Sequence, residues 1–203
     1  MGVKERRQRE KQELRTGILT AAREIAQEEG WGAVTIRKVA DLIEYSPPTI
    51  YEYFDSKDDL LQQLSMEGFR GMYSMMQSAY NSTSEPEDRL MSVSLAHWDF
   101  AWIHPDLYQV MHGLEGASCN PTAIPTEVEQ VFLIVRDSAM LALKTDVDDP
   151  GLYDAIDVLR CGIHGLISQA FQHRIMGGQQ RGRELVKRAV HDAIVAWPTH
   201  PRP

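Results

Sequence analysis

Residues 46–57 read Ser-Pro-Pro-Thr-Ile-Tyr-Glu-Tyr-Phe-Asp-Ser-Lys, and this stretch decides how the N-terminal part of the chain folds. A residue that precedes proline avoids the helical region, so we expect Ser46 to cap a helix that begins at Pro47. Ile50 and Phe54 are four residues apart and share one face of that helix, which predicts that both point into a core. The side chains on the opposite face then point outward.

Two helices are expected before this stretch. Apolar residues recur at helical spacing from Leu14 to Ile25, and Gly30 ends that segment. Thr35 is expected to cap a second, short helix whose apolar residues reach Ile43. Three short helices with a tight turn between the second and the third form a helix-turn-helix, in which the third helix lies in the major groove of DNA.

The rest of the chain predicts longer helices and no strand of useful length. We expect helices over residues 57–80, 86–103, 105–115, 125–144, 150–176 and 181–197. The predicted fold is therefore all-α, with about nine helices in a small N-terminal domain and a larger C-terminal domain. The predicted divisions are a basic arm (1–13), the helix-turn-helix domain (14–56), a ligand-binding and dimerisation domain (57–198) and a tail (199–203).

The chain has 203 residues, of which 43% are apolar and 25% charged, the composition of an ordinary globular protein. Its formal net charge is −8, but residues 1–15 contain six basic and three acidic side chains, so one end is a basic arm. The polar N-terminus lacks the apolar region of a signal peptide, and no apolar run reaches the length of a membrane helix, so we expect a cytoplasmic protein. Cys119 and Cys161 are far apart in sequence, and we expect both to be buried, reduced thiols.

Residues 18–61 resemble the DNA-binding domain of TetR-type transcriptional regulators. The run Thr-Ile-Tyr-Glu-Tyr-Phe-Asp-Ser-Lys at 49–57 matches that family's T-L-Y-x-[HY]-F-x-[SN]-K signature at the same spacing. The resemblance implies double-stranded operator DNA as a partner. By position on the three helices and at the start of the next, the candidate DNA-contacting residues are Thr35, Arg37, Lys38, Ser46, Pro47, Pro48, Thr49, Tyr51, Tyr53 and Lys57.

The chain departs from the family pattern around the third helix. Glu44 stands where the turn usually has glycine, and residues 44–54 contain no Arg, Lys, Asn or Gln. The strongest side chain–base pairs are therefore absent, and specificity is expected from hydroxyl groups, from proline contacts with thymine methyl groups and from the arm. We hypothesise that Arg6, Arg7 and Arg9 enter a minor groove. The alternative is that the arm is a solvated tail.

The resemblance also implies a homodimer joined through the last two long helices, about 150–176 and 181–197. Apolar residues recur along both segments at helical spacing, namely Leu152, Ile156, Leu159, Ile163, Leu166 and Ala170 on one and Leu185, Ala189, Ala193 and Trp197 on the other. These residues are the predicted interface. The alternative is that both rows face the core of their own subunit.

Residues 66–112 are rich in methionine, aromatic residues and histidine, which favour an adaptable apolar cavity for a small effector. The candidate ligand residues are Phe69, Met72, Tyr73, Met76, His97, Phe100, Trp102, Tyr108, Met111 and His164. The alternative for each is ordinary core packing. The histidines form no metal-binding pattern, so we expect no metal and no cofactor.

These features predict a sequence-specific DNA-binding regulator, a repressor that a small apolar ligand releases from its operator. The alternative is a ligand-independent activator or architectural protein. We do not expect an enzyme, because the sequence lacks the GxSxG, P-loop, GxGxxG, HExxH and CxxC patterns.

Overall fold

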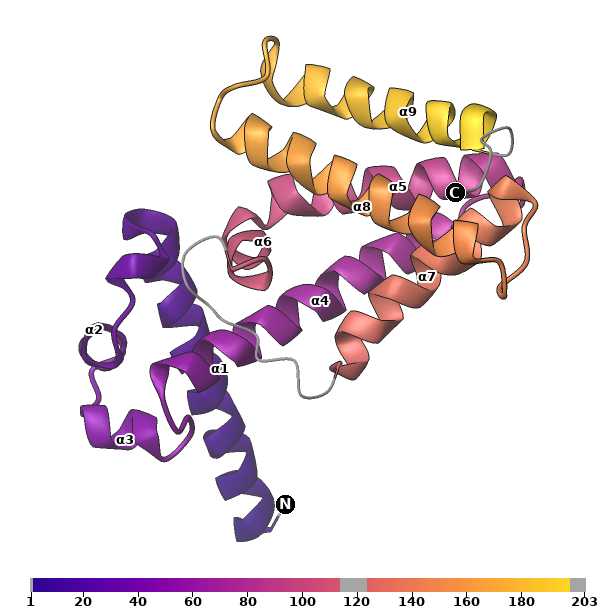
Figure 1. Ribbon diagram of the computed structural model, residues 1–203. Helices are drawn as coiled ribbons and strands as arrows, with labels where there is room; N and C mark the ends of the chain where they lie inside the picture. Colours follow the sequence, from indigo (N-terminus) through magenta and orange to yellow (C-terminus); the bar gives the residue numbers. More distant parts are fainter. Residues whose placement is uncertain (1, 114–123, 198–203) are drawn as a thin grey trace. The chain divides into compact units, whose positions relative to one another are not determined.

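The computed structural model describes residues 2–113 and 124–197, and within these ranges it contains nine α-helices, one short 3₁₀ helix and no strand (Figure 1). The all-α prediction is therefore confirmed. The helices are α1 (Val3–Glu29), α2 (Ile36–Leu42), α3 (Pro47–Tyr51), α4 (Lys57–Asn81), α5 (Pro86–Ile103), α6 (Pro105–Met111), α7 (Thr126–Leu143), α8 (Pro150–Phe171) and α9 (Gly178–Ala196), with the 3₁₀ helix η1 (Trp31–Ala33) after α1. Cys119 and the predicted tail lie outside the described residues. No helix in these ranges has the length and apolar content needed to cross a membrane.

The chain forms two compact units, residues 1–68 with 104–122, and residues 69–103 with 123–203. The structure thus divides the chain differently from the predicted boundary at residues 56 and 57. Helix α4 is continuous and contributes to both units, and α6 belongs to the first unit. Two contacts hold α6 there: Arg23 Nε donates to Asp106 Oδ2 at 2.7 Å, and Trp31 Nε1 donates to the Asp106 carbonyl oxygen at 2.9 Å.

The core of the first unit is built from the apolar faces that the sequence predicts. Ile18 and Ala22 of α1 are fully buried, as are Val39 of α2 and Ile50 of α3. Burial of each isoleucine or valine side chain contributes about 1.5–3 kcal/mol, so short helices that would not form alone are held by packing. One boundary differs from the prediction: α1 begins at Val3 rather than after an arm that ends at residue 13.

In the second unit, α5, α7, α8 and α9 pack against one another. Gly182 of α9 lets the Trp98 ring of α5 approach closely, because a Cβ atom at Gly182 would overlap Cη2 of the Trp98 ring. Beside this contact Arg183 of α9 makes two hydrogen bonds of 2.9 Å with the Asp99 carboxylate of α5. Trp197 Nε1 donates to the Gly151 carbonyl oxygen at 3.0 Å and joins the end of α9 to the start of α8.

The predicted interface row on α8 is the buried face of that helix within one subunit. Leu152, Ile156, Leu159, Ile163 and Ala170 are all at most 6% exposed, and Leu166 is half-buried. On α9 the fully buried valines are Val186 and Val190, and the four predicted residues are half-buried. The α8 row therefore serves the subunit's own core, which was the alternative, whereas the interface role of the half-buried α9 row stays a prediction. Cys161 is exposed, contrary to expectation, because it lies on the other face of α8.

Candidate functional site

A tight turn positions α3. Helix α2 ends in a Schellman motif, in which Tyr45 N–H donates to the Ala40 carbonyl oxygen at 2.9 Å and Glu44 N–H donates to that of Asp41 at 3.3 Å. Glu44 has a φ of 60°, the left-handed conformation that favours glycine. The turn position at which the family pattern has glycine is therefore left-handed in this chain as well, although glutamate occupies it.

Helix α3 presents two different faces. Ile50 is 0% exposed and Phe54 1% exposed, as predicted, whereas Tyr51 is 54% exposed. Ser46 is the N-cap residue and Pro47 begins the helix, but the Ser46 hydroxyl does not cap a backbone N–H; it shares a hydrogen bond of 3.0 Å with the Thr49 hydroxyl. These two hydroxyls, Tyr51 and the exposed Pro48 form a small, uncharged outer surface at the start of the helix.

The flanking candidates are partly engaged with other groups. Thr35 caps α2 by accepting a hydrogen bond of 3.1 Å from the Lys38 backbone N–H. Lys38 Nζ lies 2.7 Å from the Glu29 carboxylate, and the exposed Arg37 Nε lies 4.0 Å from Asp41. Lys57 Nζ donates to the Trp31 carbonyl oxygen at 3.5 Å. Of these cations, Arg37 is the most available to a phosphate.

Two cations of α1 lie over aromatic rings of the segment that follows α3, and the candidate DNA-contacting residues did not include either. Lys11 Nζ lies 5.7 Å from the centre of the Tyr53 ring, and the Arg15 guanidinium lies 5.1 Å from that of Phe54. Arg15 also donates to Gln63 Oε1 at 2.9 Å. The signal that could have found them is their spacing of four residues on the face of α1 that continues into its apolar row.

The candidate ligand residues fall in both units. Tyr108 and Met111 belong to α6 in the first unit, where Met111 packs on Gly68 and burial raises the pKa of Tyr108. The other eight belong to the second unit. Met72, Met76, His97 and Phe100 are buried there, and Phe69, Tyr73, Trp102 and His164 are half-buried.

A cluster of aromatic and histidine side chains lies between α5 and α8. The Trp102 ring meets Phe171 edge-on at 5.1 Å, and its centre is 6.0 Å from that of Trp98. Burial, followed by repulsion from His164 and Arg160, lowers the pKa of His97 to about 4, so His97 is uncharged at neutral pH. Burial also lowers the pKa of His164.

Two buried donors in this cluster lack acceptors. The indole N–H groups of Trp98 and Trp102 are enclosed and find no hydrogen-bond partner among the described residues. An enclosed donor without an acceptor costs about 1–3 kcal/mol, and two of them one helical turn apart favour a place for an acceptor atom from outside the chain. The candidate list omitted Trp98, although its spacing of four residues from Trp102 is visible in the sequence.

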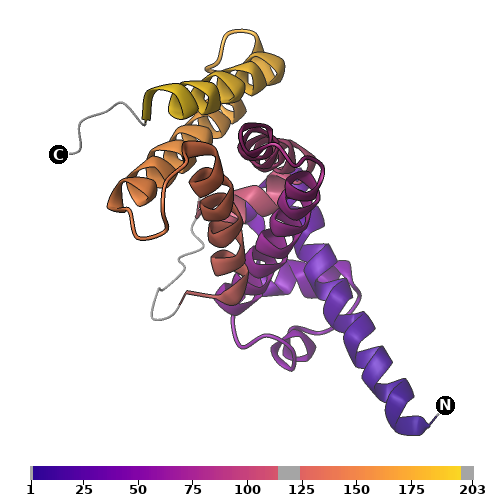
Figure 2. The same cartoon turned by 90° about the vertical axis from the view of Figure 1, so that its right-hand side faces the viewer.

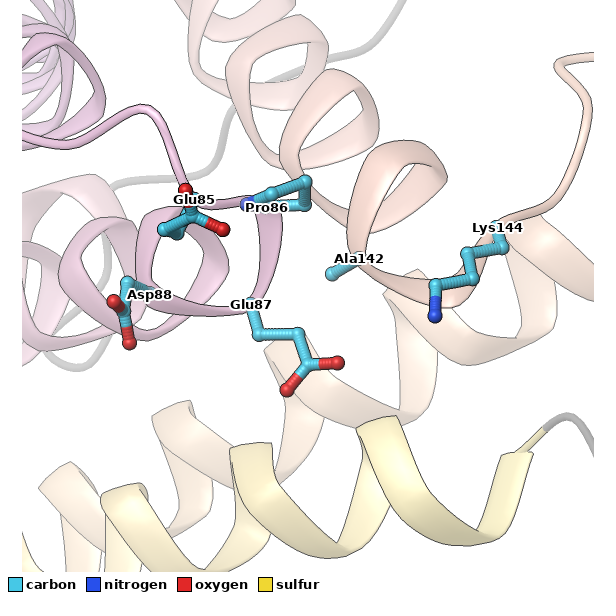
Figure 3. Close-up of a pocket in the computed structure, with 6 residues that line it drawn as sticks. All are labelled: Glu85, Pro86, Glu87, Asp88, Ala142 and Lys144. Atoms are coloured by element: carbon cyan, nitrogen blue, oxygen red, sulfur yellow. The ribbon is translucent and has the colours of Figure 1, made fainter.

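The second unit also has an open, polar pocket of about 400 Å³ where α5 begins and α7 ends (Figure 3). It is lined by Glu85, Pro86, Glu87, Asp88, Ala142 and Lys144. Carboxylates dominate this lining, and none of the ten candidate ligand residues contributes to it. The pocket therefore does not match an apolar effector site.

The structure so far defines a helix-turn-helix protein with a second, wholly helical unit among its described residues. Residues 18–64 match the family described as bacterial regulatory proteins, tetR family, and residues 90–193 match the tetracyclin repressor-like C-terminal domain. The second match alone spans half of the chain. The chain therefore belongs to the TetR family: it is a DNA-binding transcriptional regulator and not an enzyme.

Individual relatives agree with this assignment. The regulator UidR of Escherichia coli K12 is 38% identical over 60 residues, which cover 30% of this chain and 31% of UidR. The chain thus matches only about a third of the length of that relative. The activator FasR of Mycolicibacterium smegmatis is 26% identical over 147 residues, which cover 69% of this chain and 67% of FasR.

Solved structures show the same fold. A TetR regulator from Rhodococcus sp. RHA1 has a TM-score of 0.63 and 21% identity, with 92% of this chain and 98% of that chain covered. The TetR regulator PfmR from Thermus thermophilus has a TM-score of 0.59 and 14% identity, with 87% of this chain and 96% of that chain covered. Identities this low concern the fold alone.

Proposed function

We propose that this regulator is a repressor that binds a two-fold operator as a homodimer and leaves it when a small, largely apolar ligand binds. The observation that carries the DNA-binding half is the outer surface of α3, where Ser46 and Tyr51 are exposed and Thr49 is half-buried, whereas Ile50 and Phe54 are buried. That surface is the one a helix-turn-helix turns toward base edges.

Each candidate contact has a role in this proposal. The hydroxyls of Ser46, Thr49 and Tyr51 hydrogen-bond to base edges or phosphates, and Pro47 and Pro48 contact thymine methyl groups. Thr35, Arg37 and Tyr53 lie near the phosphate backbone, and Lys38 and Lys57 contact it only when they leave Glu29 and the Trp31 carbonyl oxygen. An α3 surface without a charged donor makes apolar contact and DNA shape the main sources of specificity.

The effector site lies in the second unit, around the cluster of Trp98, Trp102, Phe171, His97 and His164. Aromatic rings supply an apolar surface, and the two indole N–H groups supply donors that lack acceptors in the described residues. A ligand that fits has an apolar body and at least one acceptor oxygen, such as a ketone or a carboxylate.

The homodimer forms through the outer faces of α8 and α9. Val158 of α8 is 62% exposed and Val195 of α9 61% exposed, and a Cβ atom at Gly162 or Gly165 would meet no other atom within 4 Å. An exposed valine beside two glycines gives a helix surface that a second copy can approach closely. On α8 the proposed interface thus uses the face opposite to the predicted apolar row.

Release follows from linkage. The two α3 helices of a dimer must lie roughly 34–36 Å apart to read successive major grooves. A ligand that binds more tightly to a differently spaced dimer lowers DNA affinity by its preference for that state. Helix α4 belongs to both units and is the element that would transmit this change.

Activation is the second candidate, because the relative that matches the largest share of this chain's sequence, among those reported above, is named an activator. In a transcription assay with the operator placed over the promoter, a repressor lowers transcript and an added ligand restores it. On a second template, with the operator upstream of the promoter, transcript that rises on addition of the protein would make the chain an activator.

The DNA-binding proposal is tested with duplexes selected from a random-sequence pool by the wild-type protein. Tyr51→Ala should weaken binding to the selected duplex about tenfold, since a lost base contact costs about 1–3 kcal/mol. Leu42→Ala changes an exposed residue of the same head outside the proposed contacts and should bind as wild type does. A wild-type protein that enriches no sequence would refute the proposal.

A further inference from the structure

The DNA-binding head has too few available cations to hold DNA by itself. Residues 18–64 contain four basic and nine acidic side chains, a net charge of −5. Of the three cations near α2 and α3, Lys38 is paired with Glu29 at 2.7 Å and Lys57 is directed at a carbonyl oxygen. Neutralisation of phosphates supplies much of the affinity of any protein for DNA, so the positive charge must come from elsewhere.

The N-terminal half of α1 supplies that charge. Figure 2 shows it projecting beyond the other helices of the first unit. Its side chains from Lys4 to Glu13 are exposed, and residues 1–15 contain six basic groups against three acidic ones. The segment is helical from Val3 onward, so its charges are displayed on defined faces of a rod.

Those faces differ. Arg6 and Arg9 are each paired one turn along the helix, with Glu10 at 3.1 Å and Glu13 at 3.8 Å. Lys4, Arg7 and Lys11 follow one another at spacings of three and four, which places them on a single face. Among the described residues no carboxylate pairs with any of these three.

One end of this face lies beside the segment that follows α3. Lys11 lies over the Tyr53 ring, and Arg15, the next residue in the same row, lies over Phe54. These two aromatic residues lie two and three positions after the end of α3 at Tyr51. The basic stripe (Lys4, Arg7 and Lys11) therefore continues outward from the end of α3, over about 10 Å at 1.5 Å per residue.

We propose that the basic stripe lies along the phosphate backbone beside the site that α3 reads and extends the operator contact outward. This inference rests on the proposed function. It revises the hypothesis of Arg6, Arg7 and Arg9 in a minor groove, because an α-helix about 10–12 Å across does not fit a groove about 6 Å wide. Of those three arginines only Arg7 belongs to the stripe.

The test compares two double variants with the same change in charge, on the selected duplex extended by ten base pairs at each end. Lys4→Ala with Arg7→Ala should weaken binding at least tenfold at low salt and flatten the plot of log affinity against log salt by about 1.8 per subunit. Arg6→Ala with Arg9→Ala removes paired arginines from other faces and should leave both nearly unchanged. Lys4→Arg with Arg7→Lys keeps the charge and should bind as wild type does.

A proline substitution distinguishes a helical basic stripe from an extended basic arm. Gln8→Pro breaks the helix between Lys4 and Arg7 and the rest of α1, and should weaken binding as the stripe variant does, whereas Gln8→Ala should not. Equal losses from the two double variants, or full binding by Gln8→Pro, would overturn the inference while leaving the proposed function intact. A wild-type protein that selects no duplex would instead refute the proposed function.

Discussion

Glu44, in the turn before α3, has a left-handed backbone conformation that is unfavourable for glutamate. A left-handed residue other than glycine, asparagine or aspartate has a Cβ atom too close to the following carbonyl oxygen, at a cost of about 1–2 kcal/mol. The Schellman hydrogen bonds from Glu44 and Tyr45 compensate for this cost. Relief of the strain is therefore available by substitution, because glycine keeps both bonds and removes the Cβ atom.

Glu44→Gly should raise the free energy of unfolding by about 0.5–1 kcal/mol, with the strain relieved partly offset by the greater entropy of glycine in the unfolded chain. Glu52→Gly is the matched control, because Glu52 has a φ of −72° and glycine there should lower the free energy of unfolding by about as much. The measurement is the urea midpoint at one fixed protein concentration. If both variants lose stability, the prediction is wrong, and contacts of the Glu44 side chain stabilise the fold by more than the left-handed backbone destabilises it.

Residues at helix ends also explain where the sequence prediction failed. Glu44, Lys144 and His173 each have a positive φ and end a helix without glycine. Helix α8 was predicted to run to residue 176, since Gly177 and Gly178 follow, but it ends at Phe171. Hydrogen bonds from His173 and Arg174 close it five residues early. Because such ends depend on bonds made only once the helix has formed, residue type alone did not reveal them.

At the scale of the element, the helical spacing of apolar residues predicted which faces are buried, but it did not predict whether the same subunit or a second subunit covers them. The Ile50 and Phe54 pair was placed correctly in the head, because one face of a short helix can only meet its own core. On α8 the same kind of row could meet either the subunit core or a second subunit. The structure decides for the core, since Leu152 and Ile156 are at most 1% exposed within one chain.

The exposed face of α8, opposite the buried row, is where we expect the two subunits of the dimer to meet. In a two-fold dimer each residue near the axis meets its own copy, so Val158→Glu would set two carboxylates against each other in an apolar contact. This variant should be a monomer at micromolar concentration. Val147→Glu alters an exposed valine in the loop before α8 and should leave the dimer intact. Analytical ultracentrifugation measures both, and a dimeric Val158→Glu protein would place the interface elsewhere.

At the scale of the whole molecule, the division into units was the least predictable property. Asp106 joins the first unit through Arg23, which is 83 residues away in sequence, and through Trp31. No local pattern predicts a bond of that separation. Contacts between residues far apart in sequence also explain why the candidate ligand residues fall in two units. Tyr108 and Met111 follow α5 closely in sequence, yet they belong to the unit of the DNA-binding head.

Coupling between the two units can be tested through stability and DNA affinity together. Screening ketones and carboxylic acids with apolar bodies should find a compound that, at about 100 times its dissociation constant, adds about 2.7 kcal/mol to stability. Trp98→Phe with Trp102→Phe removes both indole donors and should lower affinity for that compound at least tenfold. Trp197→Phe should lower stability, because its N–H already has an acceptor in Gly151, but should keep the response to the compound.

The same compound must weaken operator binding by the factor by which DNA weakens binding of the compound, since linkage is reciprocal. Fluorescence anisotropy on the selected duplex, with and without the compound, measures one side, and calorimetry with and without DNA measures the other. A compound that tightens operator binding would make the ligand a co-repressor and contradict release. A double tryptophan variant that responds like wild type would move the effector site away from α5, while leaving the DNA-binding assignment, which rests on α3 and the family match, unaffected.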